Sequence, residues 1–127
     1  MSKKIIKTDK APLPIGPYNQ ATVMGNLVFV SGQIPMDLKT GQIIQGSVKD
    51  QAKLVLEHLQ SVLKEAGSSL EKVLKATVFL KDMNDFPLMN EVYSQYFKPE
   101  TAPARSTIQV ARLPKDAMVE IEVIASI

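Results

Sequence analysis

The sequence predicts an α+β protein in which two helices pack on one face of a β-sheet. Runs rich in β-branched and aromatic residues at 27–31, 73–80 and 119–125 are typical of strands. The segments 48–66 and 84–97 instead repeat apolar side chains at helical spacing. The order is therefore strands, helix, strand, helix, strands, and we expect one domain spanning residues 1–127.

The first strands are expected at residues 3–7, 20–23 and 27–31. Gly25-Asn26 separates the last two segments and predicts a tight hairpin turn between them. Residues 27–30 are apolar on both faces, which indicates a strand buried from both sides.

The clearest helix is expected over residues 48–66. Ser47 can cap its start and Gly67 suits its C-terminal end. His58, the one histidine, lies beside the apolar stripe, and we interpret it as a boundary or surface residue.

A short capped turn at 68–72 and a strand at 73–80 come next. Asn84 or Asp85 can cap the second helix, which we expect to end near residue 97. Its aromatic stripe is interpreted as core rather than as a stacking platform.

The segment 103–126 is interpreted as a closing hairpin that turns near Pro114-Lys115. One strand begins with Arg105, whose guanidinium can hold a carboxylate by two parallel hydrogen bonds. The other carries Glu120 and Glu122 within an apolar run, where burial can raise a carboxyl pKa toward neutrality. Together these residues predict a site for a small organic acid. Alternatively, their charges have a structural role, in a salt bridge between subunits or at the rim of an interface.

Simple hairpin pairing would place the Cα atoms of Arg105 and Glu120 about 15 Å apart. At that distance the two side chains would struggle to meet around one small ligand within one chain, unless a bulge shortened it. Two helices also cover only one face of a sheet whose strands at 27–30 and 119–125 look buried on both. We therefore expect a homo-oligomer in which Arg105 of one subunit meets Glu120 of the next.

Composition narrows the function further. The net charge of +2, with scattered lysines, disfavours a nucleic-acid groove. No cysteine and one histidine disfavour a zinc or iron site, leaving a carboxylate-bound magnesium as an open alternative. With no membrane span and no signal-peptide pattern, we expect a cytoplasmic protein.

Three motifs resemble the reactive intermediate deaminases, the RidA or YjgF-like family: IGPY at 15–18, SGQIP at 31–35 and PARSTIQVARLPKDAMVEIEVIA at 103–125. The resemblance implies a chorismate-mutase-like mixed sheet, a homotrimer and sites in the clefts between subunits. It also implies the activity of a 2-iminobutanoate/2-iminopropanoate deaminase. Such enzymes hydrolyse 2-enamines and 2-imines, such as 2-aminoacrylate, to 2-oxo acids and ammonia. For this chemistry general acid–base catalysis and positioning are enough, so the resemblance implies that no metal or organic cofactor is required.

The resemblance assigns a role to each matching position. Arg105 would bind the substrate carboxylate, and Glu120 would position and activate water. Thr107 stands where many members have cysteine, so its backbone N–H remains available for the carboxylate while thiol chemistry does not. The cleft-lining positions are Tyr18, Ser31, Gly32 and Asn90.

Two other functions remain open. One is a non-catalytic regulatory module that binds 2-oxo acids or amino acids in the same cleft. The other is the ribonuclease or translation-inhibitor activity described for related proteins. A pure binder needs Arg105 but no water-activating carboxylate, so Glu120 separates the first alternative from the enzyme.

Overall fold

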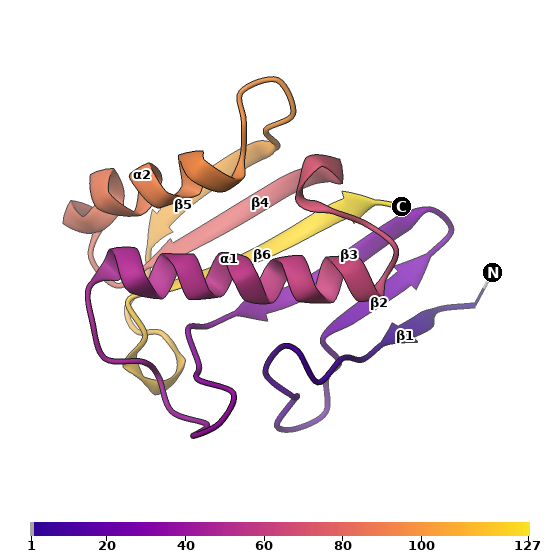
Figure 1. Cartoon of the computed structure of the whole chain (residues 1–127), viewed down its shortest axis with the longest axis horizontal. Helices are drawn as coiled ribbons and strands as arrows, with labels where there is room; N and C mark the ends of the chain where they lie inside the picture. Colours follow the sequence, from indigo (N-terminus) through magenta and orange to yellow (C-terminus); the bar gives the residue numbers. More distant parts are fainter. Residues whose placement is uncertain (1) are drawn as a thin grey trace.

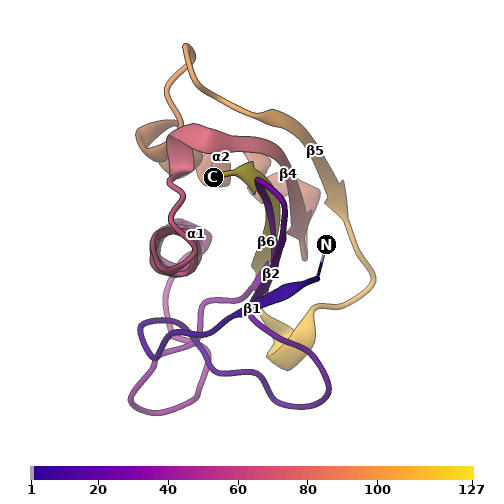
Figure 2. The same ribbon diagram turned by 90° about the vertical axis from the view of Figure 1, so that its right-hand side faces the viewer.

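A computed structural model describes residues 2–127 as one six-stranded sheet covered on one face by two helices. Figure 2 shows both helices on the same side of the curved sheet. The helices are α1 (Val48–Glu65) and α2 (Phe86–Tyr96). The strands are β1 (Lys4–Ile6), β2 (Ala21–Met24), β3 (Leu27–Gln33), β4 (Val73–Leu80), β5 (Ala104–Gln109) and β6 (Val119–Ser126). The predicted α+β class is confirmed.

The strand order across the sheet is β1-β2-β3-β6-β4-β5. All neighbours are antiparallel except β4 and β5, which run parallel. The β2–β3 hairpin is as predicted, with Gly25 at φ 61° in its turn.

The predicted closing hairpin is wrong. β5 and β6 do not pair, because β4 lies between them and bonds to both. Nine residues separate the two strands, and they cross from one side of β4 to the other through a 3₁₀ turn at Pro114–Asp116. The sequence pattern predicted both strands, but it carries no information on which strand each of them pairs with in the sheet.

Helix α1 begins where its sequence predicts. Ser47 accepts a hydrogen bond from the backbone N–H of Asp50, and the Asp50 carboxylate accepts one from the N–H of Ser47. This reciprocal capping box satisfies two amide groups that the first turn would leave unbonded. Gly67 follows the helix at φ 83°, a conformation that suits glycine.

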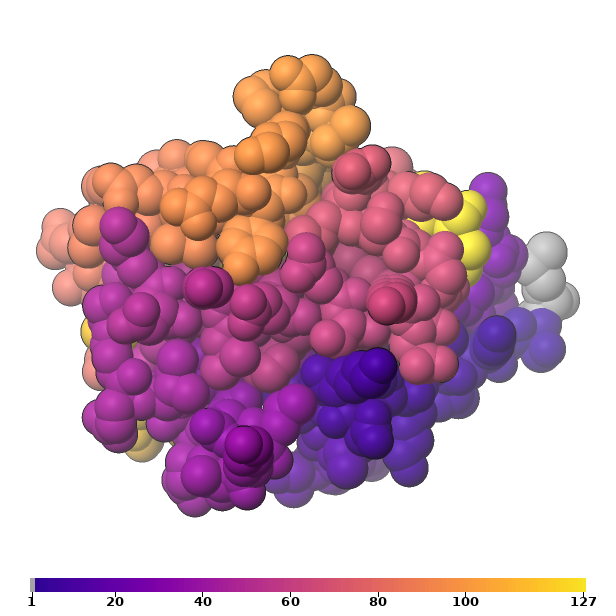
Figure 3. Space-filling model, viewed as in Figure 1, coloured from indigo at the N-terminus to yellow at the C-terminus, as the bar shows by residue number. Residues whose placement is uncertain are grey.

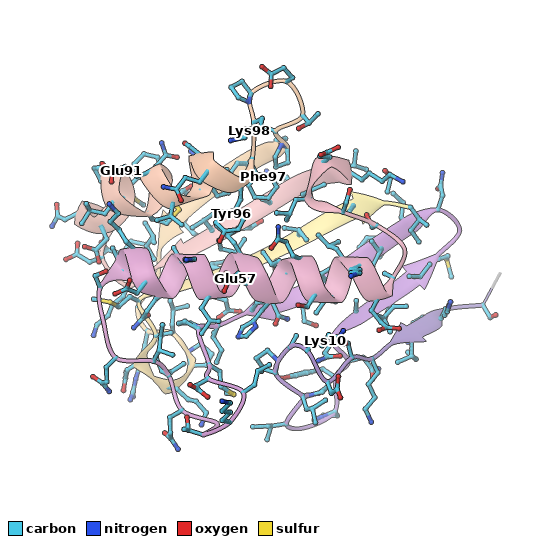
Figure 4. The ribbon with its side chains drawn as sticks, viewed as in Figure 1. Lys10, Glu57, Glu91, Tyr96, Phe97 and Lys98 are labelled. Carbon is cyan, nitrogen blue, oxygen red and sulfur yellow. The ribbon has the colours of Figure 1, made fainter. Side chains whose placement is uncertain are left out.

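Helix α2 starts differently from expectation. Neither Asn84 nor Asp85 caps it with a side chain; a 3₁₀ turn, Met83–Asp85, leads into it, and Asp82 accepts from the N–H of Asn84. Lys49 on α1 and Glu91 on α2 form a salt bridge of 2.8 Å. Figure 4 shows Glu91 on α2, and Figure 3 shows the loop that follows this helix standing out from the surface.

The core lies between the helices and the sheet. Its largest fully buried side chains include Leu56, Leu59, Leu63, Leu80, Met89 and Ile121. His58 is also buried, at 3% exposure, where α1 meets the loop that contains Met36. Of the two interpretations given for it, a boundary or a surface residue, the surface one is wrong. The aromatic stripe of α2 faces the core as predicted.

The opposite face of the sheet is open in the single chain and carries exposed apolar side chains. Cross-strand pairing places Ile5, Met24, Phe29 and Ile108 on this face, and each is more than two-fifths exposed. An exposed apolar surface of this kind is typical of an interaction surface. No helix within residues 2–127 is long and apolar enough to cross a membrane.

We predict that Leu59→Ala lowers the free energy of unfolding by about 2–5 kcal/mol, because it leaves a cavity in a layer that cannot collapse. Leu38→Ala makes the same chemical change at an exposed position and should cost less than about 0.5 kcal/mol. Denaturant unfolding at one fixed protein concentration measures both. Equal losses in the two variants would contradict this location of the core.

Candidate active site

Glu120 owes its position to the alternation of β6. Val119 and Ile121 are fully buried against the helices, so Glu120 between them points to the open face. Glu122 lies on the same open face and is exposed, whereas Glu120 is half-buried. The two carboxylates predicted from sequence therefore differ in their contact with water.

Glycine at position 32 makes room for the Glu120 carboxylate. A Cβ built on Gly32 would lie 2.8 Å from Cδ of Glu120. The adjoining part of β3, between Val30 and Gln33, is where the register with β6 shifts. A side chain at this position would displace the carboxylate, so Gly32 fixes where Glu120 can lie.

The surroundings of Glu120 favour its protonated form. Burial raises the pKa of Glu120, and the nearby charge of Glu122 raises this pKa further. Within residues 2–127 no lysine or arginine forms a salt bridge with it. A carboxyl group whose pKa is raised toward neutrality can take up and return protons more readily than an exposed one.

A cavity of about 400 Å³ brings four of the predicted site residues together: Tyr18, Ser31, Gly32 and Glu120 all line it. Its remaining walls are largely apolar and come from two loops, which contribute Pro12, Leu13, Ile15, Ile34 and Met36. Lys115 also lines it. The cavity is within the size range of small-molecule sites and contains one carboxylate.

Local hydrogen bonds orient the polar groups of this cavity. The Ser31 hydroxyl donates to the carbonyl of Asn19 over 2.6 Å. The Tyr18 hydroxyl accepts from the N–H of Ile15 at 3.4 Å, which leaves its own proton available for another acceptor. Gly16, at φ 112°, provides the bend that this contact requires.

Gln20 supports the same wall, and the sequence analysis did not identify it. Its amide nitrogen donates to the carbonyls of Thr8 and Pro12 at 2.9 and 2.8 Å, and its oxygen accepts from the N–H of Thr8 at 2.7 Å. Gln20 is buried and joins both ends of the loop that carries Tyr18. A glutamine before a strand gives no local signal of this role.

The other predicted residues lie at the β5 edge of the sheet. The Arg105 Nη1 donates to Oδ1 of Asn90 over 2.8 Å. The guanidinium carbon lies 4.6 Å from the ring centroid of Tyr93 and 5.3 Å from that of Phe86. These contacts restrict the orientation of the guanidinium by stacking and by one hydrogen bond.

Thr107 is on the same face of β5 as Arg105, two residues along the strand. Its hydroxyl is buried and, within residues 2–127, has no hydrogen-bond partner; the same is true of the Tyr93 hydroxyl. Burial raises the pKa of Tyr93, partly offset by the charge of Arg105. Tyr93 therefore stays neutral beside the arginine.

The structure does not bring the two groups of residues together in one chain. Arg105 pairs with Ala76, which faces the helices, whereas Glu120 pairs with Phe79 on the open face. Two strand spacings and three residues along the strands separate them by about 14 Å. The distance expected from the sequence, about 15 Å, is close to this value. It was nevertheless derived from a β5–β6 hairpin, and these two strands do not pair.

The arrangement places a guanidinium group at one edge of the sheet and a half-buried carboxyl group in a cavity elsewhere. Within residues 2–127 no group of three or more histidine, aspartate or glutamate side chains is arranged to hold a metal ion. The chemistry that these residues themselves can perform is binding of a carboxylate and general acid–base catalysis.

Comparison with known proteins identifies the class. Residues 8–127 match the family model described as Endoribonuclease L-PSP, and the chain belongs to this family. A RutC family protein of Pyrococcus abyssi is 56% identical over 125 residues, covering 98% of both chains.

The relatives confirm the resemblance to the reactive intermediate deaminases. Escherichia coli TdcF, whose name assigns it provisionally to those deaminases, is 51% identical over 97% of this chain and 96% of its own. Its crystal structure with bound serine matches at a TM-score of 0.90 over 98% of each chain. A Thermotoga maritima structure, described provisionally as an endoribonuclease, matches at a TM-score of 0.94, with 49% identity, over 98% of this chain and 97% of its own.

We predict that Gly32→Ala displaces the Glu120 carboxylate while the sheet stays intact, because the clash involves the end of a flexible side chain. Displacement toward water reduces burial, so the pKa of Glu120 should fall back toward its ordinary value. Carbon-detected NMR titration of the glutamate carboxyls measures this directly. An unchanged pKa would show that the close approach to Gly32 does not fix the carboxylate.

Proposed function

We propose that this protein hydrolyses reactive 2-imines and 2-enamines to 2-oxo acids and ammonia, in clefts between the subunits of a homotrimer. The observation that carries the proposal is that Glu120, whose pKa is raised, lies in a cavity that Arg105 does not line. The anchor, Arg105, is held ready on the opposite face of the sheet. The Arg105 edge and the Glu120 cavity of one chain lie apart, so a complete site needs Arg105 from one chain and Glu120 from another.

The open face of the sheet supports the assembly. Its exposed apolar side chains would be buried between subunits, at about 25 cal/mol for each Å² removed from water. In such a trimer the Arg105 edge of one subunit would meet the Glu120 cavity of its neighbour. The serine bound to TdcF is an amino acid with an α-carboxylate, which is compatible with a carboxylate anchor at Arg105.

The proposed reaction needs positioning and proton transfer. Arg105 binds the carboxylate beside the C=N bond, with help from Asn90 and the backbone N–H of Thr107. Glu120 takes a proton from water as the oxygen adds to the carbon of the protonated imine, forming a neutral carbinolamine. It then returns this proton to nitrogen. As the C–N bond breaks and the C=O group forms, Glu120 takes the hydroxyl proton and passes it to ammonia, which leaves as ammonium with the 2-oxo acid.

Tyr18, Ser31 and Gly32 have supporting roles in this proposal. The Tyr18 hydroxyl has a proton to donate and lines the cavity, so it can hydrogen-bond to the substrate. Ser31 and Gly32 are small residues that line the cavity, so they leave space for a water molecule beside Glu120. A regulatory module that only binds 2-oxo acids would need none of this proton chemistry.

Mixing two inactive variants tests the shared cleft. Arg105→Ala and Glu120→Gln chains should each be inactive, because each lacks one half of every cleft. When they are mixed and assembled at random, three-quarters of the trimers are mixed and each has one intact cleft, so about a quarter of wild-type activity should return. The measurement is 2-oxo acid release from a coupled threonine dehydratase, with light scattering to establish the trimer. Mixed trimers that stay inactive would place both residues in a site within one chain.

The pH profile tests the role of Glu120. As a base it must be ionised, and its raised pKa means that kcat/KM should fall on acidification at a pH above that of an ordinary glutamate. Glu122→Gln removes a neighbouring negative charge, lowers the pKa of Glu120 and should move this fall to lower pH. Glu120→Gln should lose about 10²–10⁴-fold in turnover while it still binds 2-oxo acids. Full activity in Glu120→Gln would favour the binding module.

A further inference from the structure

His58 lies in the middle of α1 and is directed away from solvent. Its neighbour Glu57 is exposed, and Figure 4 shows it on the outer side of the helix. His58 itself is 3% exposed. A buried imidazole with no part in the proposed chemistry requires a different explanation.

The ring makes one hydrogen bond across the fold. Nε2 of His58 lies 2.9 Å from the carbonyl oxygen of Met36. Because a carbonyl can only accept, Nε2 must carry the hydrogen. Burial lowers the pKa of His58 more than the Met36 carbonyl and Glu57 raise it, so the ring is neutral with its proton on Nε2.

The segment that His58 holds is a wall of the candidate active site. Ile34 and Met36 both line the cavity that contains Glu120. The backbone bonds of this segment stay within its own loop: Met36 bonds to Ile34, and Ile44 to Pro35. Towards α1 the loop has two ties, His58 to Met36 at 2.9 Å and Gln51 to Ile44 at 3.3 Å. The His58 tie is the one made at the wall itself.

We propose that His58 is a positioning residue that sets the apolar wall of the cavity and thereby its fit to the side chain of the substrate. The inference rests on the proposed function. Ile34 and Met36 would contact the substrate's side chain, whereas the reacting carbon would lie at Glu120. Loss of the tie therefore weakens binding of long side chains and leaves the chemical step unchanged, which raises KM without lowering kcat.

Two substitutions separate the hydrogen bond from the bulk of the ring. In glutamine the amide nitrogen is as many bonds from Cα as Nε2 of histidine, so His58→Gln can still donate to Met36. In asparagine it is one bond short, so His58→Asn is equally polar but cannot reach. The Met36 carbonyl, which is partly buried, then loses this side-chain partner.

The experiment measures imine hydrolysis by full-length protein, with the imines of alanine and leucine generated by an amino acid oxidase. His58→Asn should raise KM for the leucine imine about tenfold, and for the alanine imine about twofold or less, with kcat unchanged. His58→Gln should match wild type on both. A proportionate loss of kcat for both imines, no change in His58→Asn, or equal defects in the two variants would each overturn the inference.

Met36→Ala keeps the test decisive if His58→Asn does not fold, as judged by circular dichroism. It truncates the wall directly at a partly exposed position and should reproduce the selective rise in KM for the leucine imine. An unchanged KM would show that the wall does not contact the substrate and would overturn the inference. A wild-type protein that hydrolyses neither imine would instead refute the proposed function.

Discussion

The alternation of β6 is the constraint on which the site depends. This strand lies in the middle of the sheet, and its residues Val119, Ile121, Val123 and Ala125 fill the layer beneath the helices. Burial of that set forces Glu120 and Glu122 to the opposite face, because side chains alternate along a strand. A slip of one residue would place the carboxylates in the core. The same packing that stabilises the fold therefore presents the carboxylate.

The surroundings of Glu120 are made by parts of the chain that are remote in sequence. Gly32 on β3 leaves the space, the Gln20-bonded loop supplies Tyr18, and the segment tied by His58 supplies a wall. Gln20 and His58 are buried polar side chains that bond to backbone carbonyls. Gly32 has no side chain, which allows the Glu120 carboxylate to approach closely. Such features cost stability unless they are satisfied, and here they also shape the cavity.

The two halves of the proposed site depend on opposite faces of one sheet. Arg105 is stacked on α2, on the covered face, while Glu120 is directed to the open face. A monomer with this sheet order cannot join them. The proposed trimer would resolve this separation and also cover the apolar surface around Phe29.

The pattern of apolar and polar residues predicted the helices and strands, the α+β class and the residues that the proposed chemistry uses. The periodicity of 48–66 and the run at 73–80 predicted α1 and β4, since these patterns report which side of an element is buried. The position of β4 between β5 and β6 is visible only in the folded sheet, because strand pairing depends on the packing of all strands and not on local pattern. The burial of His58 and the four bonds of Gln20 are likewise visible only in the tertiary structure. Their partners lie 8 to 22 residues away, and no local spacing encodes those contacts.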